Sequence, residues 1–453
     1  MAVCGGIAAL IAASGAHAET LTADRSVQIA LQRNSSVIQA QAGVLDARSG
    51  LYGAYSRVLP SVSASLTRSG SGSDGNEGTQ LFGSFVTPSS RTDDESYSTI
   101  PALSGSWSVL DLSALRSMQS ARSGMRASQL RQRSTRQDVA LSTRTQFYEV
   151  VKSIRLNDVA SSALRLARDD ERRVRALFEV GSVSRSDVLK AQVRTAQSQL
   201  DSLRASQTVT NQRIALAQIL GLPEQQMGDV DTTLAVVPIE MNEAALRIEA
   251  ASARPDLMAA DAEQRAARAN LNAANLARLP ALTVRGSMEF DTKSSFSQKT
   301  YGTFLDQNGL PVTDPVSSGR NSTDRSWGAS VALTLPLFTG MATESRIASA
   351  QARMQRANDT RDVLWRNLDS DVQQAALQYR QAVVQAEVAR QAVASAEENL
   401  KLTQQKYNVG SATILDLIDA QVQLQRVQSD AVSALAGIRV AEAQLDRVRG
   451  RNE

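Results

Sequence analysis

The sequence predicts an α+β membrane protein that combines long antiparallel coiled-coil helices with four membrane-spanning β-strands, arranged in two tandem repeats. Three observations support this fold class. The chain contains two long proline-free spans with heptad spacing, four segments in which apolar and polar residues alternate, and an order of motifs that occurs twice.

The repeated motif order divides the chain into two similar halves. Residues 178–193 align without a gap with residues 407–422, and a Leu-Pro pair ending at Pro60 corresponds to another ending at Pro280. Such internal similarity indicates that one structural unit has been duplicated. We therefore expect a first repeat at residues 19–221, a link between the repeats at 222–243 and a second repeat at 244–453.

Two spans of the chain are expected to form helical hairpins. All ten prolines lie outside Ala102–Gly221 and Leu337–Glu453. Each span contains a prominent turn signal, at Gly181 in the first and at Gly410 in the second, so each predicts a long helix, a tight turn and a returning helix. A helix of about 70 residues extends roughly 100 Å, which is too long to fold back into a compact globule.

The second long helix has a heptad pattern. Its first set of positions comprises Val372, Tyr379, Ala386, Val393, Leu400 and Tyr407, and the set three residues later comprises Ala375, Ala382, Ala389, Ala396 and Thr403. A sustained period of 3.5 residues predicts a left-handed coiled coil, and the small residues allow the helices to approach closely. The stripe of an ordinary bundle is the weaker interpretation, because the pattern continues without interruption.

Four segments have the alternation of β-strands. Apolar residues occupy every second position in residues 62–66, 103–109, 282–290 and 327–335, which predicts strands of about ten residues with one apolar face. The segments 69–98 and 291–325, rich in Ser, Gly, Thr, Asp and Asn, are expected to be loops that face the outside.

These strands can belong to a soluble hairpin or to a membrane barrel. Strands of this kind in a secreted chain favour the barrel. Four strands cannot close a barrel and lipid does not tolerate an open sheet edge, so the chain would share a barrel with copies of itself. An open pore indicates twelve or more strands, hence three or more chains, and the faces carrying Arg285 and Glu289 would line water.

The N-terminal residues predict secretion and limit the chemistry. Residues 1–18 end in Ala-His-Ala and are typical of a signal peptide. The basic region that usually begins a signal peptide is missing, which suggests that the true start lies upstream. A buried N-terminal helix is the alternative.

Cys4 and His17 are the single cysteine and the single histidine. The mature chain would therefore lack both, which excludes a Ser-His-Asp triad, a thiol nucleophile, disulfides and a conventional zinc site. We predict no catalytic residues, no metal and no cofactor, and a net charge of +3 spread along helices predicts no nucleic-acid binding.

The sequence resembles the TolC-type outer-membrane efflux protein family. The resemblance rests on two Val-Gly-Ser turns, each followed by Asp-x-x-x-Ala-Gln, on the strand entries at Pro60 and Pro280, and on the Leu335–Gly340 junction. It implies a homotrimer in the outer membrane of a Gram-negative cell, with a twelve-stranded barrel in lipid and a periplasmic tunnel of twelve helices. It also implies export of drugs, small molecules or secreted proteins, through a periplasmic membrane-fusion adaptor that connects the tunnel to an inner-membrane pump.

Two carboxylates after the second turn are candidates for the pore constriction. Asp416 and Asp419 are three residues apart on one helical face, so in a trimer they would form two rings of negative charge. Helix capping is the alternative for Asp416, which follows Thr413 by three residues, and for Asp187, which follows Ser184 by three. Capping does not account for Asp419.

The resemblance also places a gate latch near the turns. By motif position, Tyr407 would pair with Asp187 and Ser186. Ala412 stands where the family often has a basic residue, and Arg185 is a candidate substitute, with a solvated turn arginine as the alternative. Core packing is the alternative for Tyr407, because it occupies a heptad position.

The turns themselves resemble the adaptor-docking turns of the family. The six residues are Val180, Gly181, Ser182, Val409, Gly410 and Ser411. A left-handed glycine turn explains the same pattern, and both interpretations can hold together. A periplasmic coiled-coil adaptor or scaffold is the second candidate function, and an enzyme is a distant third.

Overall fold

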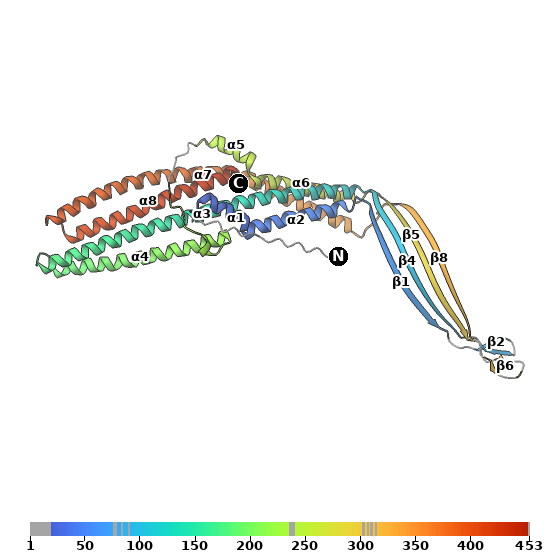
Figure 1. Ribbon diagram of the computed structural model, residues 1–453. Helices are drawn as coiled ribbons and strands as arrows, with labels where there is room; N and C mark the ends of the chain where they lie inside the picture. The colour runs from blue at the N-terminus through green and yellow to red at the C-terminus, as the bar shows by residue number, and fades with distance from the viewer. Residues whose placement is uncertain are drawn as a thin grey trace, which may run out of the picture. The chain divides into compact units, whose positions relative to one another are not determined.

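The computed structural model describes residues 20–75, 79–82, 85–88, 91–234, 241–300, 304–305, 308, 311–312 and 315–451. The expected signal segment and part of the expected link, residues 235–240, lie outside the described residues. The chain forms two compact units. One, within residues 1–47, 125–264 and 357–453, is helical, and the other, residues 48–124 and 265–356, contains the main β-sheet (Figure 1).

The main elements follow one another in the same order in both halves of the chain. The first half contains α1 (Ala23–Arg33), α2 (Ser35–Tyr55), β1 (Ser61–Asp74), β4 (Arg91–Leu110), α3 (Leu112–Glu179) and α4 (Arg185–Leu220). The second contains α5 (Glu243–Ala253), α6 (Pro255–Leu276), β5 (Ala281–Thr300), β8 (Pro315–Thr334), α7 (Ala342–Asn408) and α8 (Ile414–Arg449). The short elements are β2 (Thr79–Phe82), β3 (Phe85–Pro88), the 3₁₀ turn η1 (Glu224–Gln226), β6 (Phe304–Leu305) and β7 (Pro311–Val312). The two predicted helical hairpins are confirmed.

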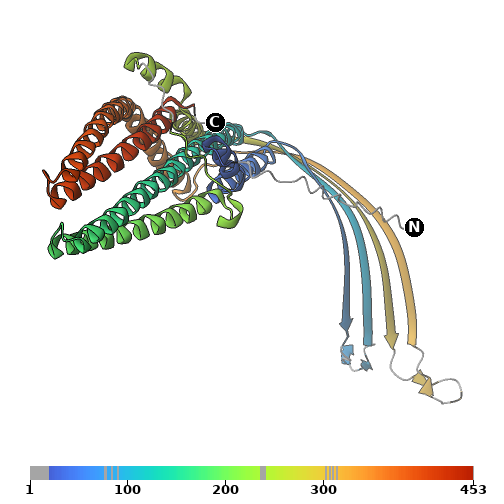
Figure 2. The same cartoon turned by 60° about the vertical axis from the view of Figure 1, so that its left-hand side comes forward.

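In the helical unit, the predicted heptad positions of α7 face inward. Val372, Ala375 and Tyr379 are buried, and the later heptad positions are buried or half-buried. Tyr379 and Ala382 pack with Ile438 and Ala441 of α8 in one apolar cluster. In both views α8 lies beside the C-terminal part of α7 (Figures 1 and 2). Among the described helices, none is both long enough and apolar enough to cross a bilayer.

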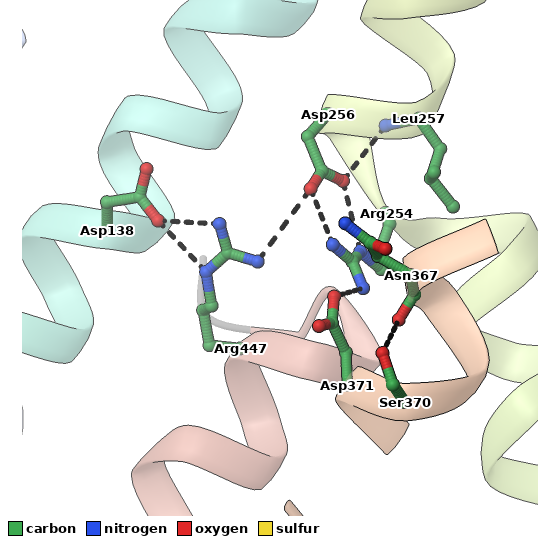
Figure 3. A network of polar contacts seen from close by, with 8 residues as sticks. All are labelled: Asp138, Arg254, Asp256, Leu257, Asn367, Ser370, Asp371 and Arg447. Carbon is green, nitrogen blue, oxygen red and sulfur yellow. Dashed lines mark hydrogen bonds and ion pairs between the residues drawn. The ribbon is translucent and has the colours of Figure 1, made fainter. Parts of the chain in front are cut away.

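A network of charged side chains links four helices of the same unit (Figure 3). Arg254, which is 3% exposed, donates to Asp256 of α6 at 2.7 and 3.1 Å and to Asp371 of α7 at 2.8 Å. Arg447 of α8 lies 2.9 Å from Asp138 of α3 and 3.9 Å from Asp256. Burial acts to raise the pKa of Asp256, but the hydrogen bonds and charge of Arg254 outweigh it and hold this pKa below its usual range. The buried guanidinium is thus matched by carboxylates.

The second unit contains an antiparallel sheet of four strands within its described residues, in the order β1-β4-β5-β8. The register places Ala64, Leu103, Met288 and Trp327 in one row across the sheet, and Ser61, Ser106, Arg285 and Ser330 in another. Because successive side chains point to opposite faces, the first row belongs to an apolar face and the second to a polar face. The alternation predicted from sequence is therefore confirmed, and β1 and β8 are the edges of the described sheet.

The predicted strand lengths and loops were wrong in part. β4, β5 and β8 each have 20 residues and β1 has 14, so residues 69–74, 91–98, 291–300 and 315–325 are strand and not loop. The apolar alternation ends where both faces become polar, but the ladder continues because it is formed by backbone hydrogen bonds.

Candidate functional site at the helix turns

The turn between α3 and α4 and the turn between α7 and α8 have the same backbone geometry. Gly181 and Gly410 have φ values of 76° and 77°. The following N–H groups, of Ser182 and Ser411, donate to the carbonyls of Leu177 and Lys406 at 2.8 and 2.9 Å. This is a Schellman closure, which requires a left-handed residue at the glycine position. The left-handed turn interpretation is confirmed, and all six predicted docking residues are exposed.

Alanine at Gly410 is expected to lower the free energy of unfolding by about 1 kcal/mol, because an L-residue is strained at positive φ. No heavy atom lies within 4 Å of the added Cβ, so crowding does not contribute. Gly50 of α2 is the matched control, since its Cβ also meets nothing within 4 Å but lies in a helix. There alanine should stabilise by roughly 0.5–1 kcal/mol. Denaturant unfolding compares the two, and the same sign for both variants would contradict the strain argument.

Asp187 and Asp416 cap the helices that follow the turns. The Asp187 N–H donates to the Ser184 hydroxyl at 3.2 Å, and the Ser184 N–H donates back to the Asp187 carboxylate at 3.3 Å. Thr413 and Asp416 repeat this arrangement at 3.2 and 2.8 Å. Hydrogen bonds from Ser184 lower the pKa of Asp187, and those from Thr413 lower the pKa of Asp416. The capping interpretation is confirmed for both carboxylates.

Asp419 differs from its neighbour Asp416. It is exposed on α8, beyond the capping box, and has no hydrogen-bond or ion-pair partner among the residues that the structure describes. Its equivalent in the first hairpin, Lys190, lies 3.4 Å from Asp187. Asp419 is therefore available to interact with ions or with another chain.

Tyr407 lies between the two turns, in an apolar cluster. It packs with Val174, Ala191, Ile414 and Leu417, and its hydroxyl is buried without a hydrogen-bond partner within the described chain. Burial raises the pKa of Tyr407, and the charge of Asp187 adds to this effect. The core-packing interpretation is thus confirmed.

The structure brings together some of the predicted latch residues. Tyr407 and Asp187 line one cavity of about 670 Å³, which Lys190, Arg173 and Ala412 also line. Ser186 and Arg185 are exposed and do not line this cavity. The arrangement places a tyrosine, an aspartate and two cationic residues around one space between the first and second hairpins.

Two buried polar contacts between the hairpins were not predicted from the sequence. Gln421 of α8 donates to the buried carboxylate of Asp170 on α3, and Arg194 of α4 donates to Gln425 of α8 at 2.8 Å. Burial raises the pKa of Asp170 despite the hydrogen bond from Gln421. The sequence signal was weak, since single charged residues in polar helices are usually solvated.

Comparison with known proteins is consistent with this architecture. The sequence model described as "Outer membrane efflux protein" matches residues 26–222 and 246–451. Outer membrane protein TolC of Vibrio cholerae is 27% identical over 293 residues, which are 64% of this chain and 62% of that protein. The chain thus spans less than two thirds of that relative.

Solved structures share the fold. The Campylobacter jejuni CmeC outer membrane channel gives a TM-score of 0.75 at 14% identity, covering 95% of this chain and 86% of that one. The outer membrane protein VceC of Vibrio cholerae gives 0.71 at 18% identity, covering 94% and 96%.

Proposed function

Because this chain belongs to the outer membrane efflux protein family, we propose that it forms a trimeric channel-tunnel in the Gram-negative outer membrane. It exports drugs, small molecules or secreted proteins that it receives from an inner-membrane pump. The observation that carries this proposal is the sheet, which has one apolar face, one polar face and two edge strands.

The sheet suits a barrel shared among copies. In lipid, each unpaired edge would leave a row of backbone N–H and C=O groups unsatisfied. Pairing β8 of one copy with β1 of the next satisfies both edges, and three copies supply twelve strands. The row containing Ser61, Ser106 and Arg285 then lines water, while the row containing Leu103 and Trp327 contacts lipid.

The helices carry further apolar stripes that suit the same assembly. On α4 the exposed residues Leu189, Val193, Leu200, Leu203 and Ile214 fall on one heptad pattern, and on α7 so do Leu377, Val384, Val388 and Leu402. Stripes with this spacing pack in coiled coils. Contacts between copies through these stripes would close a tunnel of twelve helices in the periplasm.

The two repeats, residues 19–221 and 244–453, would contribute equivalent strands to the barrel and equivalent helices to the tunnel. The link at 222–243 would lie at a belt around the tunnel. The exposed turns at Val180–Ser182 and Val409–Ser411 would dock the periplasmic membrane-fusion adaptor. Opening at the tip would be an untwisting of the helix pairs, restrained by a latch that includes Tyr407 and Asp187.

Asp416 and Asp419 would form two rings of three carboxylates at the narrowest point and favour cations. We expect Asp419→Asn to reduce cation selectivity severalfold without a change in stability, because Asp419 has no partner in the described chain. Asp416→Asn should reduce selectivity and also lower stability by about 1 kcal/mol, because it weakens a cap. Reversal potentials in planar bilayers and denaturant unfolding measure the two effects.

The same recordings test the proposed function itself. A trimer that conducts ions supports the channel, and Asp430→Asn, which changes an exposed carboxylate on α8 far from the turn, is the control for selectivity. A monomer in detergent that gives no conductance would refute the channel and favour the alternative, a periplasmic coiled-coil adaptor or scaffold.

A further inference from the structure

A buried arginine without a matching carboxylate lies between the two hairpins. Arg194 of α4 is 9% exposed. One of its terminal nitrogens donates to Gln425 of α8, but its Nε has no hydrogen-bond partner within the described chain. Because a guanidinium stays protonated in proteins, burial leaves a positive charge that a neutral amide does not balance.

The nearby carboxylates do not compensate for this charge. Asp201 acts on Arg194 only through space, and burial is the larger effect and lowers the pKa of Arg194. Asp170 accepts its hydrogen bond from Gln421 and is 3.5 Å from Arg173. Neither forms an ion pair with Arg194 in the described structure, whereas Arg254 in the same unit has two carboxylate partners.

A small cavity opens beside Arg194. Its volume is about 150 Å³. It is lined by polar side chains of Ser162, Gln421, Gln425 and Gln428 and by the apolar side chains of Val159, Ala163, Leu166 and Leu424. This volume accommodates one small ion together with several water molecules.

We propose that this cavity binds one small monovalent inorganic anion, such as chloride, between the guanidinium of Arg194 and the amide side chains of α8. Hydroxyl and amide N–H groups donate to such an ion, and the guanidinium supplies the opposite charge. Its partly apolar wall favours a weakly hydrated monovalent ion over phosphate or sulfate, whose loss of hydration is more costly. Since α4 belongs to the first hairpin and α8 to the second, the bound anion would hold the two hairpins together. This site does not depend on the proposed function.

The test compares halide with a bulky anion. The purified full chain is heated in sodium chloride, in sodium bromide and in sodium gluconate at equal ionic strength, and unfolding is followed by circular dichroism. An ion that binds only the folded state raises the apparent Tm, and we expect at least about 2 °C between chloride and gluconate. Arg194→Met should abolish this difference, whereas Arg204→Met, which changes an exposed arginine on the same helix, should retain it.

A second measurement needs no variant. Crystals grown in bromide are expected to give an anomalous peak in this cavity, within hydrogen-bond distance of the Arg194 guanidinium. Water alone at this position would overturn the proposal. So would equal apparent Tm values in chloride and gluconate, or a halide effect that persists in Arg194→Met.

Discussion

Arg254→Met is expected to lower the free energy of unfolding of the helical unit by about 3 kcal/mol, because it leaves two carboxylates without their buried partner. Asp256 is on α6 and Asp371 is on α7, so the change weakens contacts between helices that are distant in sequence (Figure 3). Denaturant unfolding followed by far-ultraviolet circular dichroism measures the loss. Because Asp371 is partly exposed, the expected loss of unfolding free energy is at the lower end of the range for broken buried ion pairs.

The control is an ion pair in the same unit that is exposed. Arg380 lies near Glu243, and both side chains are about half exposed. Arg380→Met should therefore change stability by less than about 1 kcal/mol. In a variant that also carries Asp256→Asn and Asp371→Asn, most of the loss from Arg254→Met should be recovered, because no charge remains unpaired. If the single and the triple variant lost the same amount of unfolding free energy, unpaired carboxylates would not be the cause of the loss.

The destabilisation caused by Arg254→Met should also depend on pH. The pKa of Asp256 is lower in the folded state than in the unfolded chain, so its stabilising contribution is present above the unfolded value of about 4. That contribution disappears as the pH falls through the lower, folded value. The difference between wild type and Arg254→Met should consequently shrink in acid below about pH 4.

The long helices could be predicted because their signals are local. Proline is excluded from both spans, and the heptads of α7 place Val372 and Tyr379 in the core whichever partner they meet. The helix caps could be predicted for the same reason, since Ser184-x-x-Asp187 and Thr413-x-x-Asp416 each lie within one turn.

The buried charges could not be predicted from one sequence. Arg194 and Arg204 are arginines of the same polar helix, yet one is buried and the other exposed. Whether each arginine is buried depends on where α8 packs against α4. The residue pattern of α4 alone does not specify this. The ends of the strands were missed for a related reason, because Ser69–Ser73 extends the ladder without an apolar face.

An arginine introduced on the apolar face of the sheet is expected to destabilise the trimeric barrel strongly. Val331 of β8 is 69% exposed in the single chain and is paired with Val284. If this face contacts lipid, Val331→Arg destabilises the barrel by about 3 kcal/mol near the bilayer centre, and folded trimer should be largely lost from outer-membrane fractions. Ser326→Arg places the same side chain on the opposite face, across from Glu289.

The two variants separate a lipid-facing surface from an ordinary exposed one. On a soluble sheet both introduced guanidinium groups would be solvated, and trimer yield would change little for either variant. In a barrel only Val331→Arg moves a charge into hydrocarbon, whereas Ser326→Arg places its charge in water next to a carboxylate. Heat-sensitive migration of the trimer in detergent gels reports the outcome. Equal trimer yields for both variants would exclude a lipid-facing role for the row that contains Val331, and would leave the apolar face to be covered by protein.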